Sequence, residues 1–117
     1  MKEPVIIYLF HGRIYTLYAT WSIRSLLQHG YSAIEVVVGN EREKEWICRE
    51  FPLHVCCRVL NVNIGEYPAF SYKPFALMEY MQQCGLFYSD RDIVICDADI
   101  LWKRDPRPLF ERFVKKN

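Results

Sequence analysis

The chain has 117 residues, 51% of them hydrophobic and 25% charged, a composition that supports one folded domain with a real core and argues against disorder. Its net charge of +1 gives no clustered basic excess, so we expect no nucleic-acid-binding surface. No apolar run approaches the roughly 20 residues of a membrane span, and we expect none.

Five cysteines are scattered along the chain without a CxxC pair. Their odd number and their spacing argue against a disulfide framework and against a zinc site. We therefore expect reduced, mostly buried thiols in a reducing compartment. The apolar run at residues 5–10 is too short for the core of a signal peptide, so a cytoplasmic protein is expected.

Residues 5–10 are continuously apolar and rich in β-branched side chains, which is typical of a strand buried on both faces. His11-Gly12-Arg13 predicts a turn. Residues 14–28 predict a helix that ends at His29-Gly30. Its apolar positions at roughly helical spacing are Leu17, Tyr18, Trp21, Leu26 and Leu27.

A second strand is predicted at residues 34–38, followed by Gly39-Asn40. Residues 41–51 are dense in Glu, Arg and Lys and predict a helix on the surface that stops at Pro52. Residues 54–62 form a third apolar strand in this prediction, in which adjacent Cys56 and Cys57 point to opposite faces.

Good helix formers predict a third helix at residues 71–84. Residues 93–96 are a short apolar run and predict a fourth buried strand. A last short helix is expected toward Val114, with Asp105 before Pro106 as its cap.

This regular alternation of strands and helices predicts an α/β fold, a Rossmann-like three-layer α/β/α sandwich with a mostly parallel sheet. Ligands of open α/β sheets bind outside the carboxyl ends of the strands. Three segments follow strand ends here, namely His11-Gly12-Arg13, Gly39-Asn40 and Asp97-Ala98-Asp99. The sequence therefore predicts a cleft that carries two carboxylates.

The first strand is not followed by GxGxxG, and the chain has no GxxxxGK[ST] loop, so dehydrogenase and P-loop chemistry are not expected. A divalent metal can neutralise a diphosphate instead. Asp97 and Asp99 fall on the same side if strand geometry continues through them. Paired carboxylates suit Mg²⁺ or Mn²⁺, which bind through one or two carboxylates and substrate phosphates. The alternative is that both acids only cap a turn.

The context of these acids favours the metal. An apolar strand, Asp-Ala-Asp and the pair Ile100-Leu101, followed by Asp105-Pro106 and Leu109-Phe110, resembles the DxD region of glycosyltransferases with the type A (nucleotide-diphospho-sugar transferase) fold. The segment Tyr72-Lys73-Pro74-Phe75-Ala76-Leu77 and the opening strand, turn and helix are similar to such enzymes at the level of pattern.

The resemblance implies roles for individual residues. Asp99 is expected to ligate Mn²⁺ or Mg²⁺ directly, and Asp97 to bind ribose or the metal. Lys73 is expected near the phosphates, with a solvated surface lysine as the alternative. Base contacts are expected from the first strand's exit and its neighbours, namely His11, Gly12, Arg13, Tyr15 and Asn40. Tyr15 in the buried stripe of its helix, and Asn40 as a turn residue, are the alternatives.

Two functions stay open. The first is a hexosyltransferase-like donor-binding domain that moves a sugar from a nucleotide diphosphate-sugar to an unknown acceptor, whether glycan, protein or lipid. The second is a non-catalytic nucleotide-binding or assembly module with the same half-fold. Because the family usually needs a longer chain for its acceptor site and catalytic base, we expect one domain, 1–117, that is the N-terminal part of such a fold. An unpaired sheet edge would favour a homo-oligomer.

Overall fold

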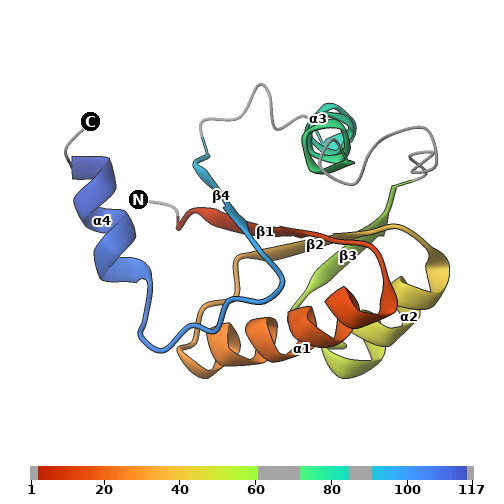
Figure 1. Cartoon of the computed structure of the whole chain (residues 1–117). Helices are drawn as coiled ribbons and strands as arrows, with labels where there is room; N and C mark the ends of the chain where they lie inside the picture. The colour runs from red at the N-terminus through yellow and green to blue at the C-terminus, as the bar shows by residue number, and fades with distance from the viewer. Residues whose placement is uncertain (1–2, 61–71, 85–90, 116–117) are drawn as a thin grey trace.

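A parallel sheet of four strands, in the order β3-β2-β1-β4, forms the centre of the protein. The structure is a computed structural model, and it describes residues 3–60, 72–84 and 91–115 (Figure 1). Its elements in chain order are β1 (Val5–Leu9), α1 (Arg13–Gln28), β2 (Ile34–Val38), α2 (Glu41–Glu50), β3 (Cys56–Val59), α3 (Tyr72–Cys84), β4 (Ile93–Cys96) and α4 (Arg107–Lys115).

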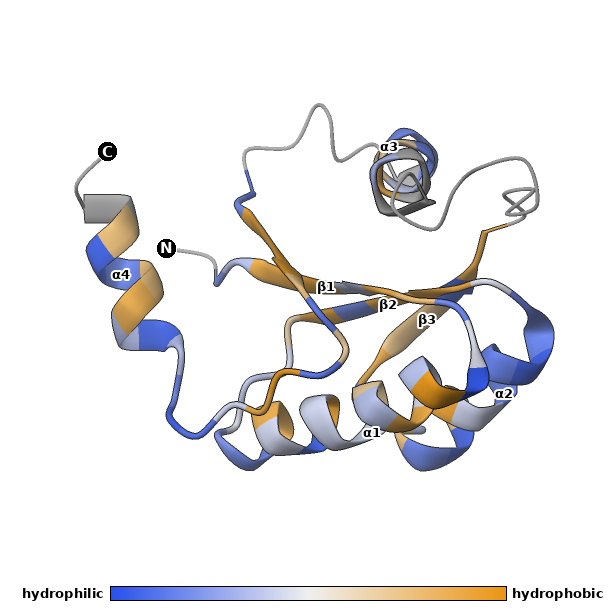
Figure 2. Ribbon diagram, viewed as in Figure 1, coloured by the Kyte–Doolittle hydropathy of each residue, from blue (hydrophilic) through white to orange (hydrophobic). Residues whose placement is uncertain are grey.

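The predicted α/β/α sandwich is confirmed. Helices α1 and α2 cover one face of the sheet, and α3 covers the other (Figure 1). β1 lies between β2 and β4, and all five of its side chains are buried. This burial explains why the strand is apolar at every position, without the alternation of a half-exposed strand. Figure 2 shows the same concentration of hydrophobic residues in the strands.

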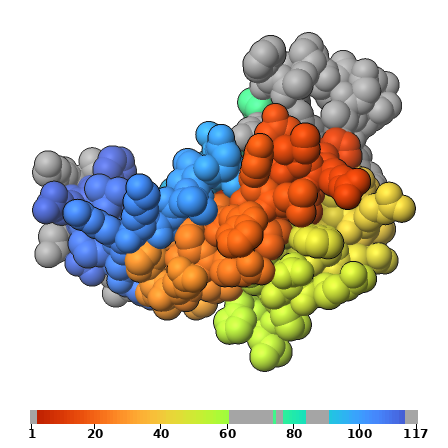
Figure 3. All heavy atoms as spheres, turned by 60° about the horizontal axis from the view of Figure 1, so that its bottom comes forward, coloured from red at the N-terminus to blue at the C-terminus, as the bar shows by residue number. Residues whose placement is uncertain are grey.

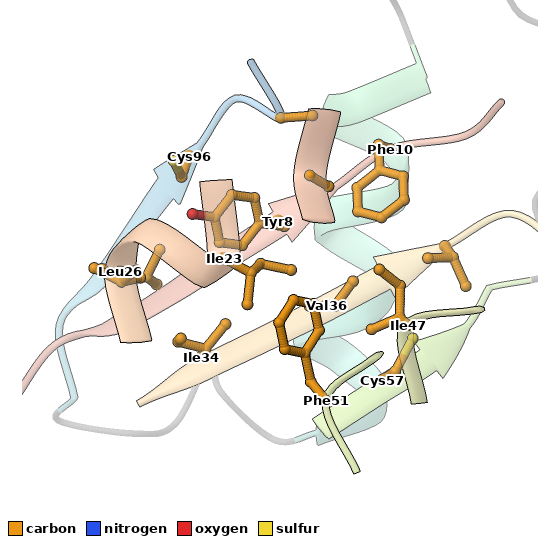
Figure 4. Close-up of a cluster of buried hydrophobic side chains, with 14 of the residues drawn as sticks. Tyr8, Phe10, Ile23, Leu26, Ile34, Val36, Ile47, Phe51, Cys57 and Cys96 are labelled. Atoms are coloured by element: carbon orange, nitrogen blue, oxygen red, sulfur yellow. The ribbon is translucent and has the colours of Figure 1, made fainter. Parts of the chain in front are cut away.

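The sheet separates two clusters of buried side chains. Tyr8 points toward the α1 and α2 side of the sheet, where it belongs to a buried cluster that includes Ile23, Val36 and Ile47 (Figure 4). Ile7 points to the opposite face and packs with Leu60 and Tyr80 of the α3 side. Successive residues of β1 therefore serve different layers, as the two-residue period of a strand requires.

The predicted strand at residues 54–62 is shorter than expected. β3 spans Cys56–Val59, and residues 61–62 lie outside the described part of the chain. Cys56 is exposed and Cys57 buried, so the prediction of opposite faces is confirmed. The expectation of mostly buried thiols fails for Cys48 and Cys56, because the first lies on the outer side of α2 and the second on an edge strand.

Several large apolar side chains of helix α1 face the surface. Its buried residues are small or hydroxyl-bearing for the most part, and they are Thr16, Ala19, Thr20, Ser22, Ile23 and Leu26. The predicted helix is confirmed, but of its apolar positions Leu26 is buried whereas Leu17, Tyr18 and Trp21 are exposed. Thr16 and Thr20 can be buried because each hydroxyl donates to a backbone carbonyl four residues earlier.

After β4 the chain turns back along α1 and then forms α4. Arg107, the first residue of α4, donates to the carbonyls of His29 and Gly30 at the end of α1. Its guanidinium also lies over the Tyr31 ring, 5.2 Å from the centroid. No helix in the described part of the chain is both long and apolar enough to cross a membrane.

Candidate functional site

The ends of β2, β1 and β4 meet at the carboxyl edge of the sheet. The register sets Leu9 beside Val37, and it sets Tyr8 beside Cys96. The turn that opens with His11 therefore lies between Gly39 on one side and Asp97 on the other. β2 and β3 are added on one side of β1, and β4 is added on its other side. Open α/β sheets bind ligands where the strand order changes direction in this way.

A buried carboxylate joins the first two strand exits. Glu43 is 6% exposed, and one of its oxygens accepts the Gly12 N–H at 2.7 Å. The other oxygen accepts the Gly39 N–H at 2.9 Å and lies 3.2 Å from His11 Nδ1. The position of Glu43 in the first turn of α2 also suits its negative charge. These bonds fix the relative positions of the two turns.

Two glycines are required by this arrangement. Gly12 has φ +111°, a conformation that side chains disfavour, and it directs the chain from β1 into α1. At Gly39 the reason is space, because a Cβ there would lie 2.2 Å from His11 Nδ1. The His11 ring therefore rests on the bare Cα of Gly39.

A pocket of about 420 Å³ opens above this junction, within the size range of small-molecule sites. Its lining includes four of the five predicted base-binding positions, namely His11, Gly12, Arg13 and Asn40. The other lining residues are Thr16, Leu17, Arg42, Glu43 and Trp46. The pocket thus combines a hydrophobic wall, a buried acid and two guanidinium groups that can meet an anion.

Asn40 has a structural role as well. It is the N-cap of α2, and its side-chain oxygen accepts the Glu43 N–H at 2.9 Å. The cap holds Glu43 in place, so Asn40 shapes the pocket that it also lines.

Tyr15 does not line this pocket. It is exposed, and its ring stands edge-on to Tyr18 with centroids 6.5 Å apart. The alternative, that Tyr15 belongs to the buried stripe of α1, is wrong because its side chain is 56% exposed.

Asp97, Ala98 and Asp99 form a turn at the end of β4. The strand ends at Cys96, and the Ile100 N–H donates to the Asp97 carbonyl at 3.4 Å. Strand geometry therefore does not continue through Asp99. The prediction that Asp97 and Asp99 lie on the same side required such a strand, so it does not apply here. Both residues are exposed, whereas Ala98 between them is buried. The buried Ala98 anchors the turn while its two neighbours face outward.

The segment after this turn is held to α1 and β1. The Trp102 N–H donates to Ser25 Oγ at 2.9 Å, and the Trp102 indole N–H donates to the Tyr8 hydroxyl at 3.2 Å. Burial raises the pKa of the Tyr8 phenol, so it stays protonated within this network. Trp102 packs against the core, and its bonds limit the movement of the Asp97–Asp99 turn.

The described residues contain no group of three or more His, Cys, Asp or Glu side chains arranged to hold a metal ion. Asp97 and Asp99 still fit a hard divalent cation in their chemistry. They offer exposed carboxylate oxygens on one turn, and Mg²⁺ needs only one or two carboxylates when phosphate oxygens and water complete its shell. Lys73 lies in the first turn of α3, and its side chain falls outside the described part of the structure.

Sequence reasoning missed Glu43, because the charge-rich helix was assigned to the surface. In the structure Glu43 and Ile47 are the buried residues of α2. The spacing Asn40-x-x-Glu43 resembles a capping box and indicates a carboxylate that turns back toward the helix start. This spacing is visible in the sequence. It does not reveal that the Glu43 carboxylate accepts N–H groups from two different strand exits, at Gly12 and Gly39.

Comparison of the chain with protein families, curated proteins and solved structures gave no match.

Proposed function

We propose that this protein binds the nucleotide diphosphate-sugar donor of a glycosyl transfer reaction. The observation that carries the proposal is the position of the β1 exit, with the pocket toward β2 on one side and Asp97 at the end of β4 on the other. Neighbouring strands lie about 4.8 Å apart, so about 10 Å separates the β2 and β4 exits. That span matches an extended nucleoside diphosphate laid across the edge.

The pocket supports binding of the nucleoside. Leu17 and Trp46 give apolar surface for a base, and the turn around Gly12 permits close approach of the backbone. Arg13 stands at the start of α1, where the helix dipole also favours an anion. We assign the base to the pocket and the phosphates to the surface between Arg13 and the Asp97–Asp99 turn.

The carboxylates support binding of a divalent metal. Mn²⁺ or Mg²⁺ would be held by Asp99, with Asp97 as a second ligand or a partner for ribose, and by the diphosphate oxygens. When bound, the metal neutralises charge on the departing nucleoside diphosphate.

Calorimetric titration with UDP, GDP and ADP, each with and without Mn²⁺, tests the proposal. One nucleotide is expected to bind more tightly with Mn²⁺, and Asp99→Asn is expected to remove that gain. Arg13→Ala is expected to weaken binding at least tenfold with or without metal, since a charge-assisted hydrogen bond contributes roughly 1.5–3 kcal/mol.

Asp92→Asn is the matched control, because Asp92 is an exposed acid just before β4, at the opposite end of the same strand. It is expected to leave both affinities unchanged. Metal-independent binding that survives Asp99→Asn would favour the non-catalytic nucleotide module. Failure of all three nucleotides to bind would refute the donor site and that module together.

A further inference from the structure

The pocket at the carboxyl edge lies between the starts of two helices. Figure 3 shows them side by side, with the first turn of α1 in red-orange and the first turn of α2 in yellow. Polar side chains line the pocket from both helices, and the fold already uses some of their hydrogen-bonding groups. The groups that remain decide which ligand the pocket can recognise.

The carboxylate of the pocket is used by the fold itself. Glu43 accepts the N–H groups of Gly12 and Gly39, and the oxygen that faces Gly39 also lies 3.2 Å from His11 Nδ1. Glu43 is only 6% exposed. A ligand group that donates hydrogen bonds therefore does not meet an exposed carboxylate at Glu43.

Two further polar groups of the lining are also used internally. The Thr16 hydroxyl donates to the Gly12 carbonyl at 2.8 Å, and Thr16 is buried. The Trp46 indole N–H donates to Thr20 Oγ1 at 2.9 Å. Trp46 therefore offers a ligand its ring surface and not its N–H group.

Asn40 differs, because half of its amide remains available. Its side-chain oxygen caps α2 by accepting the Glu43 N–H at 2.9 Å, and this bond fixes which end of the amide is the oxygen. The NH₂ group makes no hydrogen bond within the described part of the chain, and it can only donate. Turning the amide over would set this NH₂ group against the Glu43 N–H. Asn40 is thus a donor of fixed orientation in the lining of the pocket.

The exposed charged groups of the lining are donors as well. Arg13 and Arg42 carry guanidinium N–H groups, which cannot accept hydrogen bonds. Since Arg13 is assigned to the phosphates, Arg42 and the Asn40 amide remain for the base. The base that complements these two side chains presents carbonyl oxygens to them.

We propose that the pocket selects uracil, and that Asn40 is the residue that determines this specificity. Uracil carries two carbonyl oxygens and no exocyclic amine, whereas cytosine and adenine each present an amine that would face the Asn40 NH₂ group. In this arrangement Asn40 donates to a uracil carbonyl while the ring lies against Trp46 and Leu17. The inference rests on the proposed nucleotide site and adds the identity of the base, so that the donor is a uridine diphosphate-sugar.

Calorimetric titration of the full chain with UDP and with CDP, both in the presence of Mn²⁺, tests this selection. The two nucleotides share ribose and diphosphate and differ only at the edge of the base, so the ratio of their affinities isolates that edge. UDP is expected to bind about tenfold more tightly, because with CDP one hydrogen bond is lost and two donors face each other.

Two variants of Asn40 retain the cap and change only what the pocket can recognise. Asn40→Asp replaces the NH₂ group by an acceptor oxygen, and Asp caps a helix as well as Asn does. We expect CDP to bind more tightly than UDP in this variant, while the added negative charge weakens both diphosphates alike and cancels in the ratio. Asn40→Ser caps α2 without an amide, and the preference for UDP is expected to disappear.

Asp105→Ser is the matched control, because the Asp105 side chain accepts the Arg107 N–H at the start of α4 and does not line the pocket. It is expected to leave the ratio of UDP to CDP affinity unchanged. Equal or tighter binding of CDP by the parent protein, or a ratio that Asn40→Asp does not alter, overturns the inference and leaves the donor site standing. Failure of every nucleotide to bind refutes the donor site and this selection with it.

Discussion

The indole N–H of Trp102 donates a hydrogen bond to the hydroxyl of Tyr8 over 3.2 Å, joining residues 94 positions apart in the sequence. Tyr8 lies on the central strand, and its hydroxyl also meets Ser22 Oγ of α1 at 2.7 Å. The segment that carries the Asp97–Asp99 turn is thereby fastened to the core of the domain.

Removing the Tyr8 hydroxyl should loosen this junction. Tyr8→Phe removes the hydrogen-bond partner that the Trp102 indole N–H and the buried Ser22 hydroxyl share. We expect this to lower the free energy of unfolding by roughly 1–3 kcal/mol. Urea denaturation followed by circular dichroism measures the change. Tyr18→Phe is the control, because Tyr18 is exposed, and it should leave the stability within about 0.5 kcal/mol. An equal effect of both variants would contradict the role of the junction.

The Glu43 carboxylate should not be replaceable by an amide. In Glu43→Gln the new NH₂ group must face the N–H of either Gly12 or Gly39, since both carboxylate oxygens are acceptors. We expect a loss of roughly 1–3 kcal/mol in unfolding free energy and weaker nucleotide binding. Denaturant unfolding and calorimetry provide the two readouts. Glu45→Gln, at an exposed position of the same helix, should change neither.

The contact between Gly39 and His11 can be tested with a double-mutant cycle. Gly39→Ala places a methyl group 2.2 Å from His11 Nδ1, and we expect it to destabilise the fold by roughly 1–3 kcal/mol. His11→Ala removes the obstructing ring, so the second substitution should cost much less in that background. Unfolding free energies of the four proteins give the coupling. Additive effects would show that the ring is not the cause.

Thiol labelling should distinguish the cysteines by position. Burial raises the pKa of the Cys57 thiol to about 12, and burial also raises the pKa of Cys96. Both should resist an alkylating reagent near pH 8, because the thiolate is the reactive form. Cys48 is exposed and should react first, and Cys56 should follow more slowly because burial and the Glu35 charge raise its pKa. Peptide mass mapping over time gives the order, and labelling of Cys57 before Cys48 would contradict it.

Alkaline pH should weaken the fold through its buried phenols. Burial raises the pKa of Tyr31 to about 12, while its hydroxyl donates to the Pro4 carbonyl. The unfolded chain loses this proton near pH 10, so the stabilisation is complete below that value and is lost as pH rises toward 12. Melting temperatures of Tyr31→Phe should therefore fall less steeply across this window than those of the parent, with Tyr8 responsible for part of the remaining slope. Parallel slopes would contradict this assignment.

The sequence by itself determined the alternation of elements and the sheet. The predicted strands at residues 34–38 and 93–96 have the observed bounds, because short β-branched runs favour a strand. The expectation that residues 93–96 are buried is wrong, since β4 is an edge strand and Ile95 is 42% exposed. The turns at strand ends were also identifiable, and with them the position of His11, Asn40 and Asp97 along one edge. These are consequences of local pattern and of the geometry of parallel strands.

Only the tertiary structure decided which way individual side chains face. Glu43 is in the interior because N–H groups from two strand exits converge on it, and no local pattern contains both. Trp21 faces outward because small and hydroxyl residues give α1 the closer approach to the sheet. The carboxyl-edge pocket depends on contacts between segments distant in sequence, and those contacts exist only once the chain has folded.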